Sequence, residues 1–176
     1  DSVTLAAARA LVDWRGVHLT GLRSAVWLDR AGMALDLGGI AKGYILGQAM
    51  AELRSRGLSS ALIEAGGDMV LGDPPSGRPG WDVAVVGMEP GPLANVAVAT
   101  SGTTEQYLEI AGVRYAHIID PRSGLGLPTV RVATVIGPDP ATADALATAL
   151  VVLDAARGQR LLAGFPGYRA LVRVPE

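Results

Sequence analysis

The clearest element in the sequence is a helix over residues 141–153, and it limits how the rest of the chain can fold. The turn Pro138-Asp139-Pro140 precedes this helix and is a common way of entering one. Apolar patterns with a period near 3.6 residues predict further helices over 2–12, 40–56 and 155–162. Gly57 follows the second of these at the position where glycine often ends a helix. Each helix has an apolar face that must pack against another element.

Strand patterns fill most of the remaining chain. Alternating or short apolar segments predict strands over 25–29, 33–37, 60–64, 81–86, 96–100, 106–110, 114–119, 131–136 and 168–174. We expect residues 69–71 to continue the strand at 60–64, turns at 30–32 and at Gly112, and an exposed loop over 73–80, which is rich in Pro and Gly. Strands and helices do not alternate strictly. The pattern therefore predicts an α/β or α+β fold, with mixed sheets and packed helices.

The composition suits a packed domain and excludes several kinds of chemistry. The 176 residues are 49% hydrophobic and 18% charged, with a formal net charge of -2. There is no basic stripe, so we expect no nucleic acid partner. The absence of cysteine excludes disulfides, thiolate nucleophiles and zinc–thiolate sites. We interpret residues 1–176 as a single domain or a domain fragment, because the chain starts close to a helix with no leader.

The segment 36–43 is the first candidate for a ligand site. A predicted strand ends at Asp36, Gly38 and Gly39 follow, and Lys42 lies in the first turn of the next helix. Free N–H groups and the helix dipole favour an anion at such a start, and Lys42 adds a full positive charge. The same pattern also fits an ordinary joint between a strand and a helix.

The segment 117–124 contains His117, one of two histidines, followed by a turn that begins at Asp120. A neutral imidazole accepts a proton near pH 7, so His117 is a candidate base. In a strand, His117 and Ile119 share one face and Ile118 lies on the other. A purely structural, hydrogen-bonded histidine remains the alternative. We interpret the other histidine, His18, as structural.

Asp144 and Thr148 stand four residues apart in the predicted helix over 141–153, so they share one face of it. Carboxylate and hydroxyl oxygens among alanines can bind a hard cation. The alternative is an acidic residue that interacts with the helix dipole and a threonine that bonds to its own helix. Together the three segments suit Mg2+-assisted phosphoryl chemistry, where charge stabilisation and positioning lower the barrier.

Five segments, taken in order, resemble the successive motifs of the ApbE family of FAD:protein FMN transferases. They are LDLGGIAKGY (35–44), IEAGGD (63–68), ATSGT (99–103), YAHIIDPRSG (115–124) and ADALATAL (143–150). The resemblance covers roughly residues 14–153. It implies the C-terminal portion of an ApbE-like flavin transferase fold. Two departures are Glu64, where other members often have Asn, and the segment 103–105, in which Glu105 stays close to the pattern.

The resemblance implies a role for each candidate residue. Asp36, Lys42 and Ile119 contact FAD, which is the substrate, and His117 and Asp144 are catalytic, with His117 as the base. Mg2+ binds the side chains of Asp144 and Thr148 and the backbone carbonyl of Gly39. The implied reaction transfers FMN from FAD to a Thr or Ser hydroxyl of an acceptor protein that carries a flavinylation motif, and releases AMP.

Family members are usually longer, and the extra part is N-terminal and helps to hold the flavin. We therefore expect an N-terminal segment, in cis or as a second chain, to complete the FAD site. Without it, the 176 residues should bind FAD weakly and expose an apolar patch. Nothing in the sequence fixes the compartment. The resemblance suggests the extracytoplasmic face of the bacterial cytoplasmic membrane.

Two other functions remain open at the level of the sequence. A Mg2+-dependent FAD pyrophosphatase uses water in place of the protein hydroxyl and gives FMN and AMP. A non-catalytic flavin-binding protein needs no base, so the presence of His117, Asp144 and Thr148 favours an enzyme.

Overall fold

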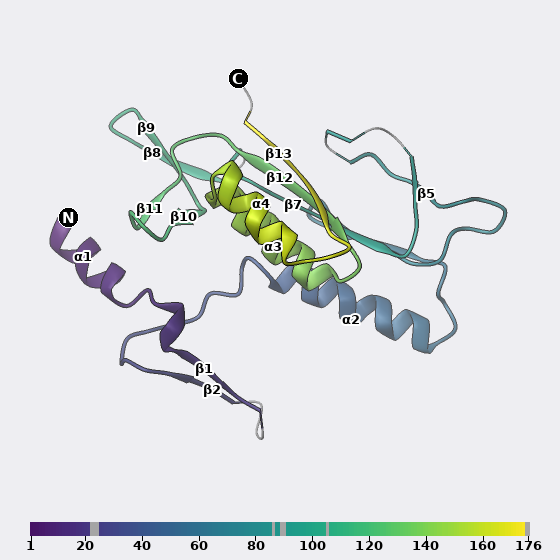
Figure 1. Cartoon of the computed structure of the whole chain (residues 1–176), viewed down its shortest axis with the longest axis horizontal. Helices are drawn as coiled ribbons and strands as arrows, with labels where there is room; N and C mark the ends of the chain where they lie inside the picture. The colour runs from purple at the N-terminus through teal and green to yellow at the C-terminus, as the bar shows by residue number, and fades with distance from the viewer. Residues whose placement is uncertain (22–24, 86, 89–90, 105, 175–176) are drawn as a thin grey trace.

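The structure is a computed structural model that describes residues 1–21, 25–85, 87–88, 91–104 and 106–174. A five-stranded sheet forms its centre, with strand order β13-β12-β7-β4-β3 (Figure 1). The strands are β3 (Leu62–Ala65), β4 (Asp68–Leu71), β7 (Val96–Gly102), β12 (Val132–Gly137) and β13 (Arg169–Arg173). All neighbours in this sheet pair antiparallel, so the prediction of helices and sheets in one fold is confirmed in its α+β form.

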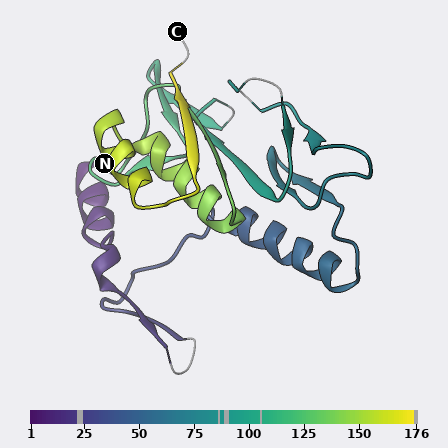
Figure 2. The ribbon, with the colours of Figure 1, turned by 45° about the vertical axis from the view of Figure 1, so that its right-hand side comes forward.

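Helices cover one face of the sheet. They are α2 (Ala41–Ser55), α3 (Pro140–Val152) and α4 (Ala155–Ala163), close to the predicted ranges. In Figure 2, α2 and α3 meet near their starts and extend away from each other along the sheet. Alternate strand residues point to this side, and Leu46, Met50, Leu146 and Leu150 meet them in one apolar core. The strand residues in that core are Val70, Ala97, Ala99, Ala133 and Val135.

The opposite face of the sheet has a smaller core. Leu71, Val98 and Ile136 are buried there against the segment that leaves β4 and returns to β7. This segment contains the predicted loop and only two short strands, β5 (Trp81–Asp82) and β6 (Pro92–Leu93). The predicted strand over 81–86 is therefore too long, because residues 83–85 have no regular structure. Residue 86 lies outside the described residues.

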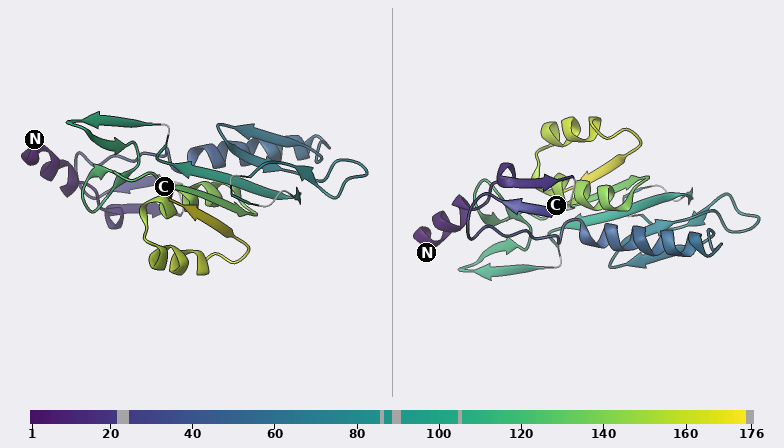
Figure 3. Two further views of the ribbon diagram at one scale, coloured as in Figure 1. Left: turned by 90° about the horizontal axis from the view of Figure 1, so that it is seen from above. Right: turned by 90° about the horizontal axis from the view of Figure 1, so that it is seen from below.

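The N-terminal elements lie apart from the sheet, as Figures 1 and 2 both show, and the N-terminus lies at one end of the molecule in Figure 3. Helix α1 (Ser2–Ala10) has no buried residue, and Leu5 and Leu11 are only half-buried. A short 3-10 helix (Trp14–Gly16) leads into a hairpin of β1 (Val17–Thr20) and β2 (Ala25–Leu28). Large side chains are exposed here, including Val12, Trp14, Leu19 and Trp27.

The strand predicted over 33–37 is wrong, because these residues have no regular structure. Residues 25–28 pair instead with residues 17–20, the stretch around His18. The segment 33–37 then becomes the connection to α2. The choice between the two pairings depends on partners elsewhere in the chain, which local alternation does not specify.

Two further expectations differ in detail. Residues 69–71 do not continue the preceding strand but turn back to pair with it, through Gly66 (φ 56) and Gly67 (φ 87). Glycine adopts such left-handed angles at little cost, which explains the tight turn. The predicted strand over 114–119 is interrupted at residues 117–118, between β9 (Val113–Ala116) and β10 (Ile119–Asp120). Strand β8 (Tyr107–Ile110) pairs with β9 through the predicted turn at Gly112, and β10 pairs with β11 (Leu125–Gly126).

Candidate functional site

The start of α2 meets the start of α3 because Gly43 has no side chain. A Cβ atom on Gly43 would lie 2.1 Å from the backbone oxygen of Pro140, a distance that no real side chain tolerates. This close approach brings the Gly43 N–H to the Asp144 carboxylate, with 3.0 Å between Gly43 N and Asp144 Oδ2. Two candidate segments about a hundred residues apart in sequence are thereby joined.

Asp144 is a buried carboxylate, with 2% of its surface exposed. Burial is the main cause that raises its pKa, because a charged carboxylate loses hydration inside the protein. The hydrogen bond from Gly43 acts in the opposite direction, the negative charge of Asp68 raises the pKa further, and the positive charge of Lys42 lowers it. The net effect is upward, so the fold does not fully compensate the charge of Asp144.

Thr148 lies one helical turn after Asp144 and next to Gly39. A Cβ atom on Gly39 would lie 3.2 Å from Thr148 Cγ2 and 3.4 Å from Thr148 Oγ1. The Thr148 hydroxyl also shares a hydrogen bond of 2.8 Å with the hydroxyl of Ser101, at the end of β7. The three residues predicted to hold a metal therefore come together, although the metal itself stays a prediction.

Lys42 and Asp36 flank this cluster. The Lys42 ammonium lies 2.9 Å from Asp68 Oδ2, and 43% of the Lys42 side chain is exposed. Asp36 is exposed and does not enter the cluster directly. Its Oδ1 accepts a hydrogen bond of 2.7 Å from the Gly38 N–H, which shapes the turn just before Gly39.

The start of α2 has no side-chain cap, since Ile40 occupies the N-cap position. The Ala41 N–H donates to Leu37 O and the Gly43 N–H donates to Asp144. Among the described residues no acceptor takes the Lys42 N–H. Uncapped amides of this kind, beside a lysine side chain, suit an anionic group such as a phosphate.

His117 and Ile119 lie on an exposed segment, with the buried Ile118 between them. The predicted alternation of faces is thus kept, although the strand is interrupted. The His117 N–H and its Nδ1 both lie within hydrogen-bond distance of the Gln106 carbonyl oxygen, at 3.0 and 3.2 Å. No hydrogen bond or ion pair in the described part of the chain joins His117 or Ile119 to Asp144 or Thr148.

Arg122 closes the turn that follows this segment. Its guanidinium forms hydrogen bonds with both oxygens of Asp120, at 2.8 to 3.1 Å, and holds the pKa of Asp120 below its ordinary value. The backbone oxygen of Arg122 accepts a hydrogen bond from Arg9 of α1. The turn is therefore tied to the N-terminal helix. His18 has a different environment, paired with Asp29 at 2.9 Å and stacked on Trp27, in keeping with its structural interpretation.

No sequence pattern indicated a role for Asp68 or Ser101, although both stand in the quoted motifs. Asp68 is 2% exposed and contacts Lys42, and Ser101 contacts Thr148. One signal was available for Asp68, namely an acidic residue directly before the apolar run of β4. Ser101 had no such signal. Glu105, which stays close to the family pattern, lies outside the described residues.

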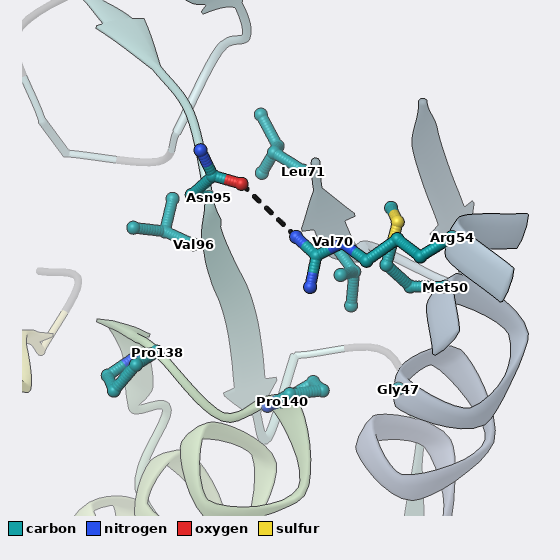
Figure 4. Close-up of a pocket in the computed structure, with 9 residues that line it drawn as sticks. All are labelled: Gly47, Met50, Arg54, Val70, Leu71, Asn95, Val96, Pro138 and Pro140. Atoms are coloured by element: carbon teal, nitrogen blue, oxygen red, sulfur yellow. Dashed lines mark hydrogen bonds between the residues drawn. The ribbon is translucent and has the colours of Figure 1, made fainter. Parts of the chain in front are cut away.

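A hollow of about 270 Å³ lies elsewhere on the molecule (Figure 4). It is bounded by the C-terminal half of α2, by β4 and β7, and by the turn before α3. Arg54 crosses its edge and donates a hydrogen bond of 3.1 Å to Asn95. None of the candidate residues lines it, so this hollow is not part of the site.

A buried carboxylate, a hydroxyl and an uncapped helix start with a lysine make up a site suited to a phosphate-bearing ligand. The sequence profile of the ApbE family matches residues 1–172. The chain belongs to the ApbE family.

Similar proteins include the FAD:protein FMN transferase of Treponema pallidum (strain Nichols), 37% identical over 198 residues, covering 100% of this chain and 55% of that protein. Among solved structures, the ApbE protein of Thermotoga maritima matches with a TM-score of 0.84 and 32% identity, over 99% of this chain and 59% of the other. The flavinyl transferase ApbE of Pseudomonas stutzeri matches with a TM-score of 0.81 and 32% identity, over 100% of this chain and 56% of the other. These likenesses confirm the predicted fold.

The chain spans only part of its relatives. It covers 55%, 33% and 51% of three of the curated proteins it matches, all named FAD:protein FMN transferase. In the described part of the chain, every helix is too short or too polar to cross a membrane.

Proposed function

We propose that this chain carries the catalytic site of a Mg2+-dependent FAD:protein FMN transferase. The protein transfers FMN from FAD to a Thr or Ser hydroxyl of an acceptor protein and releases AMP. The observation that carries the proposal is the meeting of α2 and α3 at Gly43, which gathers Gly39, Lys42, Asp144 and Thr148 at one place. The name shared by the related proteins supports the same activity.

The donor atoms at this place fit Mg2+. Asp144 Oδ2 accepts from Gly43, and in the described residues no hydrogen bond reaches Asp144 Oδ1. Thr148 supplies a hydroxyl, and the Gly39 backbone lies against it. In the described chain no cluster of three or more His, Cys, Asp or Glu residues could hold a metal. A single carboxylate with few further oxygens suits Mg2+ that is bound together with substrate phosphates.

The positive groups at the start of α2 would bind the pyrophosphate of FAD. The partly exposed Lys42 ammonium and the Lys42 N–H support this role, and the helix dipole adds to their effect. A bound Mg2+ would offset negative charge on the phosphates and on the departing AMP. Asp36 shapes the turn that leads to this end of the helix, which is consistent with an FAD contact.

His117 is suited to act as the base. A carbonyl oxygen accepts hydrogen bonds but cannot donate them, so Nδ1 carries the proton that points to Gln106 O. In a neutral ring this leaves Nε2 as the acceptor. In the proposed step, the acceptor hydroxyl attacks the phosphorus of the FMN half and gives its proton to Nε2 of His117. The bond between that phosphorus and the AMP oxygen breaks, and AMP leaves.

The test is incubation of the full-length protein with FAD, Mg2+ and a candidate acceptor protein, with AMP and the acceptor mass followed together. We expect AMP release and a gain in acceptor mass equal to FMN, both of which require Mg2+. AMP and free FMN without a mass gain would favour the pyrophosphatase instead. FAD binding with no AMP under any condition would favour a non-catalytic flavin-binding protein.

A further inference from the structure

We propose that Asp68 is a positioning residue that holds the ammonium of Lys42 ready for the pyrophosphate group of the substrate. This inference rests on the proposed function. Neither the names of the related proteins nor the resemblance to the family motifs assigns such a role to Asp68. Asp68 is the second buried carboxylate of the region. In the proposed reaction it is neither a ligand of Mg2+ nor a residue that contacts the acceptor hydroxyl.

Asp68 stands at the first position of β4, directly after the Gly66-Gly67 turn, and it is almost fully buried. Its Oδ1 accepts a hydrogen bond of 2.9 Å from the Thr100 N–H of β7. Its Oδ2 has no hydrogen bond of good geometry but lies 2.9 Å from the Lys42 ammonium of α2. The carboxylate therefore connects two strands of the sheet to the helix that begins at the site.

A purely structural role does not account for the charge of Asp68. The Thr100 N–H needs only an acceptor, and the neutral amide of asparagine would supply one. An ionised carboxylate that is buried loses hydration, which is costly unless the charge is paired. The one cation within reach in the described residues is Lys42. The negative charge at this position therefore serves to hold the Lys42 ammonium in place.

Lys42 gains from such a partner because its side chain is long and flexible. A free lysine loses rotamer entropy when it binds a ligand, and a lysine already held in place loses less. The ammonium has three N–H donors, and Asp68 Oδ2 contacts it on one side. The exposed part of the side chain leaves the other donors open to a ligand. The charges of Asp68 and Lys42 both reach Asp144, which places all three at one site.

The test is a double-mutant cycle on the full-length protein, with ADP and FAD as probes and calorimetry in Mg2+ as the measurement. Asp68→Asn keeps an acceptor for the Thr100 N–H, and Lys42→Met removes the ammonium. We expect each variant to weaken binding by about 10-fold, the scale of one hydrogen bond to a charged group. If Asp68 acts through Lys42, the double variant should also lose about 10-fold. A loss near 100-fold would mean that the two residues act independently and would overturn the proposal.

Two controls separate positioning from general damage. Thr134→Val removes another buried hydroxyl of the same sheet, which lies 3.2 Å from the Thr100 hydroxyl, and should leave ADP and FAD affinity unchanged. If Asp68→Asn does not fold, Lys42→Arg decides the matter in its place. Positioning by Asp68 predicts that arginine, with the same charge and a different reach, binds ADP about as weakly as Lys42→Met. Affinity equal to that of the wild type would overturn the proposal.

The transfer assay on the same proteins keeps the two proposals distinct. FMN transfer by the wild type together with independent effects of Asp68 and Lys42 would remove this inference alone. Coupled effects on ADP and FAD binding in a protein that transfers no FMN would remove the proposed function and leave the pairing of Asp68 with Lys42 in place.

Discussion

The two parts of the candidate site are built in opposite ways. The part around Asp144 is buried and braced, since Gly43, Ser101 and Asp68 tie two helices and the sheet together there. The part around His117 lies on an exposed segment, and both hydrogen bonds that hold the histidine are accepted by one backbone carbonyl, that of Gln106. Changes in the first part should therefore alter stability as well as activity. Loss of the His117 side chain in the second part should alter the rate of transfer alone.

Asp144→Ala should have the largest effect. It removes the only carboxylate of the proposed metal site, so we expect Mg2+-dependent AMP release to be lost while the fold is kept. AMP release and circular dichroism measure the two properties. Asp154→Ala is the matched control, because this carboxylate caps α4 instead of facing the site, and it should keep normal Mg2+ dependence. Full turnover by Asp144→Ala, with unchanged Mg2+ dependence, would contradict the assignment.

His117→Ala should have the next largest effect and should act on the rate alone. Loss of a general base slows transfer by about 10²–10⁴-fold. FAD affinity and the melting temperature should stay close to the wild type, because the side chain is exposed. His18→Ala is the control and should change neither rate nor affinity. Weak FAD binding with normal turnover at saturation would instead make His117 a binding residue.

The sequence predicted these two parts unequally. The helices were predictable because capping residues and apolar periodicity are local: Asp139 caps α3, and α2 ends just before Gly57. The contact between Gly43 and Asp144 was not predictable, because it depends on how closely α2 and α3 approach each other on one face of the sheet. Family resemblance named Gly39, Asp144 and Thr148 together, whereas spacing alone placed only Asp144 and Thr148 on one face.

Other details depended on contacts that no local pattern contains. The 33–37 segment alternates well enough for a strand, yet β2 pairs with β1 and leaves it as a connection. Asp68 follows two glycines in the sequence, and its burial beside Lys42 follows from the pairing of β4 with β7. In both cases the deciding partner comes from elsewhere in the chain.

Gly43→Ala tests the brace directly and should lower stability. The added Cβ would meet the Pro140 backbone, which cannot move aside like a flexible side chain, so α2 and α3 must separate. Overpacking of this kind costs about 1–3 kcal/mol in the free energy of unfolding. Denaturant titration measures it, and Mg2+ binding should weaken in parallel as the Gly43 N–H moves away from Asp144. Gly21→Ala, where no heavy atom of the described residues lies within 4 Å of the new Cβ, should have little effect. Equal stability of the two variants would show that the helix contact is not tight.

The smallest effect should come from the charge of Asp144 in the metal-free protein. Burial raises its pKa above the unfolded value, so between these two values the folded state binds more protons than the unfolded state. The contribution of Asp144 to stability should therefore fall as the pH rises through its folded pKa, and should return as the pH is lowered.

Asp144→Asn keeps an acceptor for the Gly43 N–H without the charge, so in EDTA at neutral pH it should melt at a higher temperature than the wild type. Mg2+ should reverse the order, because it stabilises only the protein that binds it, by about 2.7 kcal/mol at a concentration 100 times its dissociation constant. Thermal melts of both proteins in EDTA and in Mg2+ between pH 4 and about pH 8, the range in which a raised carboxyl pKa is seen, provide the measurement. Mg2+ that raised the melting temperature of Asp144→Asn as much as that of the wild type would place the cation away from Asp144.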